Sequence, residues 1–180
     1  AANESAVSEN RIISIKELQF PARIVSIEVD GSPLKLGMVI GHGLAERNHD
    51  SDDWTPLAIP GVFSSSLPMN SITFYTARGH GSTHGWENST DSDPDQFTWP
   101  RLAEDMIDIA RNVGYEEVIV GGESMGSSTA FFAALQNPEL VKGVIMMRPP
   151  TAWESRAYQR DRLEQAALRL ESKQDAGQHF

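Results

Sequence analysis

Short apolar segments recur along the chain and are separated by polar ones. Apolar and polar residues alternate over 23–29, which predicts a strand, and Asp30-Gly31 predicts a turn before the apolar pattern resumes. We therefore expect an early hairpin at this turn. The nearly continuous apolar run 36–40 is typical of a parallel-sheet strand that is covered on both faces, and 71–75 predicts the next strand.

Helical spacing appears in the middle of the chain. Apolar residues three or four positions apart predict an amphipathic helix over 100–112 that ends near Gly114. An apolar run, a second helical pattern that stops near Gln136 and another apolar run at 141–147 follow. Because strand and helix signals alternate, we expect an α/β fold. Its sheet would be twisted and mostly parallel, with helices on both faces and a site at the carboxyl ends of the strands.

The two ends of the chain differ from this middle part. Residues 1–10 are small and polar, which predicts a disordered lead-in, and 11–152 form the predicted α/β core. A helical apolar stripe among charged residues begins at Leu163. We therefore interpret 153–180 as the start of a lid or packing helix, followed by a polar tail.

The clearest candidate chemistry lies where the second helical pattern begins. Gly122-Glu123-Ser124-Met125-Gly126 fits the pattern G-x-S-x-G, in which a sharp strand-to-helix turn exposes the serine. Gly122 and Gly126 suit this turn because side chains there would collide where the backbone doubles back. Ser124 is then a candidate nucleophile, and the N–H of Met125 can face negative charge on a substrate oxygen. The alternative is a glycine-rich loop without chemical function.

A second candidate feature follows the apolar run 36–40, where the sequence reads Gly41-His42-Gly43-Leu44. A loop after a buried strand can turn a backbone N–H, here that of Leu44, toward the serine. Together with Met125 it would complete an oxyanion hole with two donors. His42 and Gly43 would support this loop. We interpret the His42 ring as a brace for its own loop, with proton transfer as the alternative.

Composition narrows the range of functions. The 180 residues, 39% hydrophobic and 22% charged, are typical of one soluble globular domain. The net charge of −10 opposes binding to phosphate backbones, so we expect no nucleic-acid partner. No apolar run approaches the roughly 18 residues of a membrane span, and the polar start lacks the apolar core of a signal peptide. The compartment stays open, and the cytoplasm is favoured.

We expect neither a cofactor nor a metal. The chain has no cysteine, no Walker pattern and no G-x-G-x-x-G after a strand. His80 and His84 are spaced like metal ligands, but no third ligand follows at a set offset and Gly81 disfavours a helix between them.

Four features together resemble the α/β-hydrolase superfamily in order and spacing, over about residues 22–150. They are the His42-Gly43 loop, the Arg78-Gly79-His80-Gly81 turn, the helix from Pro100 and the turn at Ser124. The resemblance implies a serine hydrolase of carboxylic esters or related acyl bonds, acting on a small acyl substrate. It makes Ser124 the nucleophile and gives Met125 and Leu44 the oxyanion N–H groups. Small departures are Thr76, where relatives often carry an acid, and Ser127-Ser128, where a further glycine is common.

The large departure is at the carboxyl end. In this superfamily the triad acid and histidine follow two further strands, which this sequence does not show. Asp175 with His179, or Glu154, are candidate substitutes. A serine without a base is a weak nucleophile, so we expect the chain alone to be impaired. Missing strands would also expose 141–147 as an apolar sheet edge and favour self-association. The alternative function is a non-catalytic module that binds a ligand or a partner.

Overall fold

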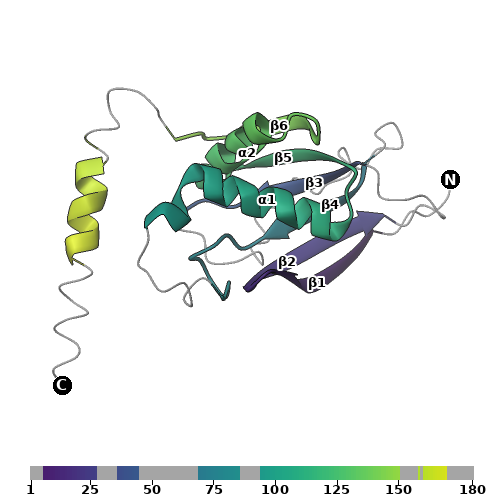
Figure 1. Ribbon diagram of the computed structural model, residues 1–180, viewed down its shortest axis with the longest axis horizontal. Coiled ribbons are helices and arrows are strands. Elements are labelled where there is room, and N and C mark those ends of the chain that lie inside the picture. Colours follow the sequence, from purple (N-terminus) through teal and green to yellow (C-terminus); the bar gives the residue numbers. More distant parts are fainter. Residues whose placement is uncertain are drawn as a thin grey trace, which may run out of the picture. The chain divides into compact units, whose positions relative to one another are not determined.

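The computed structural model describes residues 6–27, 36–44, 69–85, 94–150, 158 and 160–169. Six strands form one sheet in the order β1-β2-β4-β3-β5-β6 (Figure 1). Their bounds are Ala6–Ile15 (β1), Leu18–Ile27 (β2), Leu36–Gly41 (β3), Met69–Tyr75 (β4), Glu117–Glu123 (β5) and Val141–Met147 (β6). The pairs β4/β3, β3/β5 and β5/β6 are parallel, whereas β2 is antiparallel to both β1 and β4. The predicted mostly parallel α/β sheet is confirmed.

The early hairpin is not the one predicted. Its turn lies at Lys16 and Glu17, between β1 and β2, and Lys16 adopts a left-handed φ of 54°. The predicted turn at Asp30-Gly31 lies outside the described residues. Strands β2 and β3 do not pair in the described sheet, because β4 lies between them. The predicted hairpin is therefore wrong: alternation identifies a strand but not the strand beside it.

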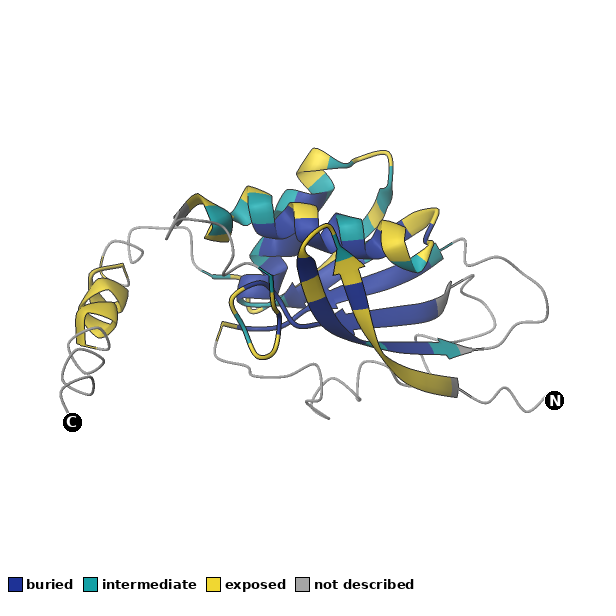
Figure 2. Ribbon diagram, turned by 60° about the horizontal axis from the view of Figure 1, so that its bottom comes forward, coloured by how far each residue is buried: buried dark blue, intermediate teal, exposed yellow. Residues whose placement is uncertain are grey.

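Strand β1 begins inside the segment that was predicted to be disordered. Ala6–Asn10 pairs with residues 23–27 of β2, and the Arg23 side chain donates a 3.0 Å hydrogen bond to the Ser8 hydroxyl. Residues 7–12 are exposed at this edge of the sheet (Figure 2). Backbone pairing, which composition does not reveal, orders these polar residues. The predicted lead-in is thus wrong for residues 6–10.

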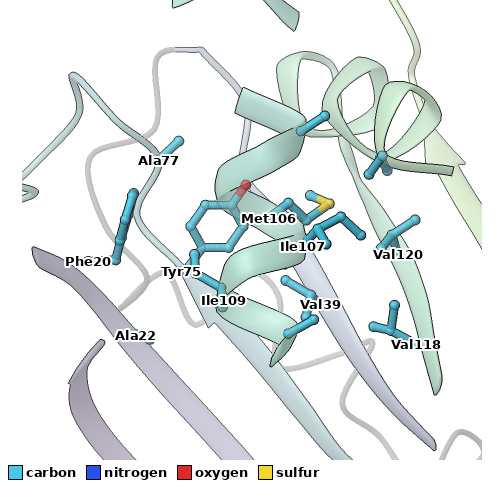
Figure 3. Packing of buried hydrophobic residues seen from close by; sticks show 14 of the residues in the cluster. Phe20, Ala22, Val39, Tyr75, Ala77, Met106, Ile107, Ile109, Val118 and Val120 are labelled. Atoms are coloured by element: carbon cyan, nitrogen blue, oxygen red, sulfur yellow. The ribbon is translucent and has the colours of Figure 1, made fainter. Parts of the chain in front are cut away.

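Two described helices pack on one face of the sheet (Figure 1). A short 3-10 helix, Pro94–Phe97 (η2), precedes α1 (Trp99–Val113), and α2 (Met125–Gln136) follows β5. The predicted amphipathic helix is confirmed: its apolar side is buried against the sheet, and Gly114 ends it with a φ of 99°. Figure 3 shows Met106 and Ile107 of α1 packed between Tyr75 of β4 and Val120 of β5.

The other face of the sheet carries a second buried apolar cluster. Its members come from β2, β3 and β4: Val25, Met38, Ile40, Ile72 and Phe74. The expectation of helices on this face concerns parts of the chain outside the described residues. Burial on both faces explains why the run 36–40 is apolar at nearly every position.

Residues 150–180 form a second compact unit. It contains a helix over 160–169 whose described residues are all exposed (Figure 2). Its function as a lid or packing helix remains a prediction. No helix in the described part of the chain is long and apolar enough to cross a membrane.

Candidate active site

A single residue separates β5 from α2. Strand β5 ends at Glu123 and α2 begins at Met125, so Ser124 forms the turn, as the G-x-S-x-G pattern predicts. Its φ of 48° and ψ of −105° lie in a region that side-chain-bearing residues rarely adopt. Ser124 occupies the N-cap position of α2, yet its side chain makes no capping hydrogen bond. The hydroxyl is therefore not used to stabilise the helix.

Three glycine backbones make this turn sterically feasible. A β-carbon at Gly122 would lie 2.6 Å from the carbonyl oxygen of Gly41, at the end of β3. A β-carbon at Gly126 would overlap the same carbonyl group. The ends of β3 and β5 and the start of α2 therefore meet backbone to backbone. This is the close approach that the sequence predicted for positions 122 and 126, with Gly41 as a third member.

Hydrogen bonds hold the main chain of Ser124 on both sides. Its N–H donates to the Met147 carbonyl over 2.9 Å, at the end of β6. Its carbonyl oxygen accepts a 2.7 Å hydrogen bond from the Ser127 hydroxyl and a 3.3 Å hydrogen bond from the Ser128 N–H. Ser127 is fully buried. The pattern did not predict its contact with Ser124.

The loop after β3 is fixed by the His42 ring, which is buried. Its Nε2 accepts a 2.9 Å hydrogen bond from the Ala77 N–H, so the proton of a neutral ring lies on Nδ1. The Nδ1–H then donates to the Gly43 carbonyl over 2.7 Å. Both ring nitrogens are engaged within the loop region. His42 therefore restrains the loop through both ring nitrogens, and its part in the site remains a prediction.

The loop also contacts the start of α2 directly. The Gly126 N–H donates a 3.0 Å hydrogen bond to the His42 carbonyl. The N–H of Met125, one position earlier, precedes any intrahelical acceptor and has none among the described residues. Leu44 is exposed on the same loop. The structure thus places the loop of Leu44 beside the helix start of Met125, and their function as an oxyanion hole remains a prediction.

The Arg78-Gly79-His80-Gly81 turn is anchored to α1. The Arg78 guanidinium donates two hydrogen bonds, of 2.9 and 2.7 Å, to the Asp105 carboxylate, and both side chains are buried. Burial raises the pKa of Asp105, and the hydrogen bonds and charge of Arg78 offset part of this rise. The sequence pattern singled out the turn but gave no signal for Asp105 as its partner.

Among the described residues, none that could act as a base contacts the Ser124 hydroxyl. Asp175, His179 and Glu154 lie outside the part of the chain that the structure describes. Glu123, next to the serine, forms a 2.9 Å ion pair with Arg148 at the end of β6. His80 bonds to carbonyl oxygens, and His84 joins a backbone bridge with Gln19. Over the described ranges, no three acidic or histidine side chains are grouped to hold a metal ion.

Comparison with known structures shows the same fold. A predicted CIB-like hydrolase from Thermoplasma acidophilum is 20% identical, with a TM-score of 0.62, over 81% of this chain and 64% of that one. The juvenile hormone epoxide hydrolase of the silkworm Bombyx mori is 14% identical, with a TM-score of 0.58, over 81% of this chain and 35% of that one. This chain therefore spans less than two thirds of the length of either structure.

The sequence itself matches a family of known fold. The profile of the alpha/beta hydrolase fold family matches residues 38–177, which contain the loop of His42, the Arg78 turn and the strand-turn-helix at Ser124. The match covers most of the chain and agrees with the sheet order and the turn geometry. This chain therefore belongs to the alpha/beta hydrolase fold family.

Proposed function

We propose that this chain is a serine hydrolase of carboxylic esters or related acyl bonds, which forms an acyl-enzyme on Ser124. The observation that carries the proposal is the turn at Ser124, where a strained backbone is held by hydrogen bonds while the hydroxyl does not cap the helix. Backbone strain of this kind persists only where surrounding contacts enforce it, and it is concentrated at functional sites. Fixing the main chain in this way presents the side chain to a substrate.

In this mechanism the Ser124 oxygen attacks the carbonyl carbon of the substrate, and negative charge develops on the carbonyl oxygen. The N–H groups of Met125 and Leu44 would donate hydrogen bonds to that oxygen. Support comes from the 3.0 Å hydrogen bond between Gly126 N–H and His42 carbonyl, which joins the two segments that carry the donors. Removing one such donor lowers kcat by about 10²- to 10³-fold in a serine protease.

The attack also requires a base that accepts the serine proton. Both nitrogens of His42 are engaged elsewhere, and Asp175, His179 and Glu154 remain candidates outside the described residues. In serine proteases, loss of a triad member leaves a rate roughly 10³ to 10⁴ times that in water. We therefore expect slow chemistry from the chain alone, with faster chemistry when a base is supplied.

A fluorophosphonate probe tests the nucleophile directly. The Ser124 oxygen bonds to phosphorus, fluoride leaves and the serine proton passes to a base. We expect one added probe per chain by intact mass, at a rate that imidazole in the buffer increases. Ser124→Ala should abolish labelling, whereas Ser128→Ala, four residues further along, is the matched control and should retain it.

Two outcomes would reject this proposal. A folded sample that stays unlabelled with imidazole would favour the non-catalytic module that binds a ligand or a partner. Labelling that survives Ser124→Ala would place the reactive group elsewhere. Ester and epoxide substrates should be compared, because one structurally similar protein is an epoxide hydrolase by name. Cleavage of esters but not of epoxides would support acyl transfer.

We also propose that the chain associates with a second copy of itself through β6. This strand is an edge of the described sheet and exposes Val144, Ile145 and Met146. Its register with β5 places Val144 and Met146 on one face and Ile145 on the other. The only charged residue of β6 is Lys142. An antiparallel pair of β6 strands centred on Val144 would thus place Lys142 of each copy opposite Met146 of the other, with no like charges directly opposite each other.

A further inference from the structure

His80 lies beside the loop that carries Leu44, a contact that its place in the Arg78-Gly79-His80-Gly81 turn did not predict. Its ring is 5.0 Å from the His42 ring, centroid to centroid, and the two rings meet edge to face at 67°. His80 Nε2 lies 3.0 Å from the Leu44 carbonyl oxygen, and Nδ1 lies 3.0 Å from the Arg78 carbonyl oxygen. Both partners are acceptors, and a neutral ring carries one N–H, so His80 donates to one of these two carbonyl groups.

The two histidines fix successive peptide groups of the loop. His42 Nδ1–H holds the Gly43 carbonyl, which shares a planar peptide with the Leu44 N–H. The described chain contains no cis peptide, so this N–H points away from the carbonyl that His42 binds. His80 Nε2 lies 3.0 Å from the next carbonyl oxygen, that of Leu44. Leu44 is thus restrained on both sides by an imidazole.

The turn that carries His80 is itself rigidly attached. Its Arg78 side chain is bound to buried Asp105 through two hydrogen bonds. Within the turn, the His80 N–H donates to the Ala77 carbonyl and the His80 carbonyl accepts from the Thr83 N–H, each over 3.1 Å. The turn is thus fixed to α1 through Arg78. Its His80 side chain contacts the Leu44 carbonyl, so the Leu44 loop is connected to α1 through this turn.

We propose that His80 is a positioning residue for the oxyanion hole, acting through its Nε2–H on the Leu44 carbonyl. This inference rests on the proposed hydrolase function. Without the hydrogen bond, the Leu44 carbonyl loses this restraint, and the Leu44 N–H would no longer be held in the orientation that the proposed oxyanion hole requires. The rate of the step that forms the oxyanion should then fall, because an N–H donor stabilises the new charge only if the donor is already in position.

Two amide substitutions of His80 test the contributions of its two ring nitrogens separately. The side-chain amide of Gln can replace Nε2–H and donate to Leu44, whereas the shorter Asn can replace only Nδ1–H and donate to Arg78. We expect His80→Gln to be labelled by the fluorophosphonate within about threefold of the unmodified rate. His80→Asn should be labelled about 10- to 100-fold more slowly than the unmodified chain. The upper value approaches the loss of about 100-fold or more that follows removal of an oxyanion donor.

A spectroscopic measurement tests the contact without any chemistry at Ser124. The carbonyl ¹³C shift of Leu44 reports the hydrogen bond that it accepts. We expect His80→Gln to retain this shift and His80→Asn to change it. In the unmodified chain, ¹⁵N spectra of the imidazole rings should show a proton on His80 Nε2 and on His42 Nδ1.

The outcomes distinguish this inference from the proposed function. If the unmodified chain is not labelled, the hydrolase proposal fails, and the Leu44 shift alone decides whether His80 holds the loop. If both variants are labelled at the unmodified rate with Ser124 still essential, the positioning function is rejected and the hydrolase remains. An unprotonated Nε2 in the unmodified chain would also reject it, even if neither variant folds.

Discussion

The Gly126 N–H and the His42 carbonyl are 3.0 Å apart and form a hydrogen bond between the start of α2 and the loop after β3. This contact has two consequences. It uses the Gly126 N–H, so that group is not a further donor to a substrate oxygen. It also couples the proposed donors Met125 and Leu44, because the segments that carry them cannot separate without breaking it.

Close packing at this junction predicts that Gly126→Ala is strongly destabilising. The new methyl group would overlap the Gly41 carbonyl, and relieving the overlap requires moving either β3 or α2. Overpacking of this kind costs about 1–3 kcal/mol or more in free energy of unfolding. Urea denaturation followed by circular dichroism measures the effect.

Gly143→Ala in β6 is the matched control for this substitution. Its methyl group would meet Ile119 at 3.6 Å, an ordinary contact, so its stability should change by less than about 0.5 kcal/mol. Equal losses in the two variants would show that the overlap at Gly126 is not the cause.

The buried ion pair between Arg78 and Asp105 predicts a strongly non-additive pair of substitutions. Arg78→Met or Asp105→Leu alone leaves one buried charge without its partner, which costs about 3–5 kcal/mol. The double variant removes both charges and should lose less than the sum of the two single losses. A double-mutant cycle of urea denaturation measures the coupling, and additive losses would argue against the pair.

Asp105 also predicts a pH dependence of stability. Burial raises its pKa in the folded state, so the folded chain binds this proton more readily than the unfolded chain does. Its stabilising contribution is complete below the unfolded value of about 3.9 and declines as pH rises through the folded pKa. Relative to Asp105→Asn, the unmodified chain should lose stability as the pH rises above about 4. The opposite slope would mean that the charge of Arg78 outweighs burial.

Two buried tyrosines predict a loss of stability in alkali. Burial raises the pKa of Tyr75, with a further contribution from the charge of Asp105. Burial also raises the pKa of Tyr115, although its hydroxyl lies 2.8 Å from those of Ser71 and Thr73. The folded pKa of each tyrosine exceeds the unfolded value of about 10. The free energy of unfolding should therefore decline as the pH rises above about 10.

Tyr75→Phe should therefore unfold at higher pH than the unmodified chain in an alkaline titration followed by circular dichroism. Tyr158→Phe, whose side chain is 66% exposed, serves as the control. A shift of equal size in both variants would contradict the effect of burial.

Self-association through β6 predicts a mass that increases with protein concentration. Ile145→Lys should shift the chain toward the monomer in sedimentation experiments, because a buried lysine opposes strand pairing. Ile12→Lys is the control, since Ile12 is 56% exposed on β1 at the opposite edge of the sheet. A chain that is monomeric at every concentration, or that responds equally to both substitutions, would reject pairing through β6.

The sequence predicted those features that depend on local spacing. The period of α1, its stop at Gly114 and the turn at Ser124 follow from residues that are close along the chain. The place of β4 between β2 and β3 could not be predicted, because strands of similar pattern can pair in several orders. The β1/β2 turn at Lys16 lacks glycine or asparagine and so gave no signal.

The candidate site likewise contains some features that the sequence predicted and others that it did not. Gly122, Ser124 and Gly126 form one motif, so the pattern revealed them together. The contact from His80 to Leu44 joins residues 36 positions apart, and that from Arg78 to Asp105 joins residues 27 apart. Neither pair has a spacing rule, because the distances depend on how the sheet brings β3, β4 and α1 together.

The overlap that a side chain at Gly126 would make with Gly41 also concerns how the chain folds. The peptide backbone that confines the turn at Ser124 belongs to β3, which precedes it by some eighty positions. A nascent or excised β5–α2 segment therefore lacks the constraint that maintains the unusual dihedral angles of the serine. Reactivity at Ser124 should therefore arise late in folding, once β3 has packed against the turn between β5 and α2. It should disappear whenever β3 transiently detaches.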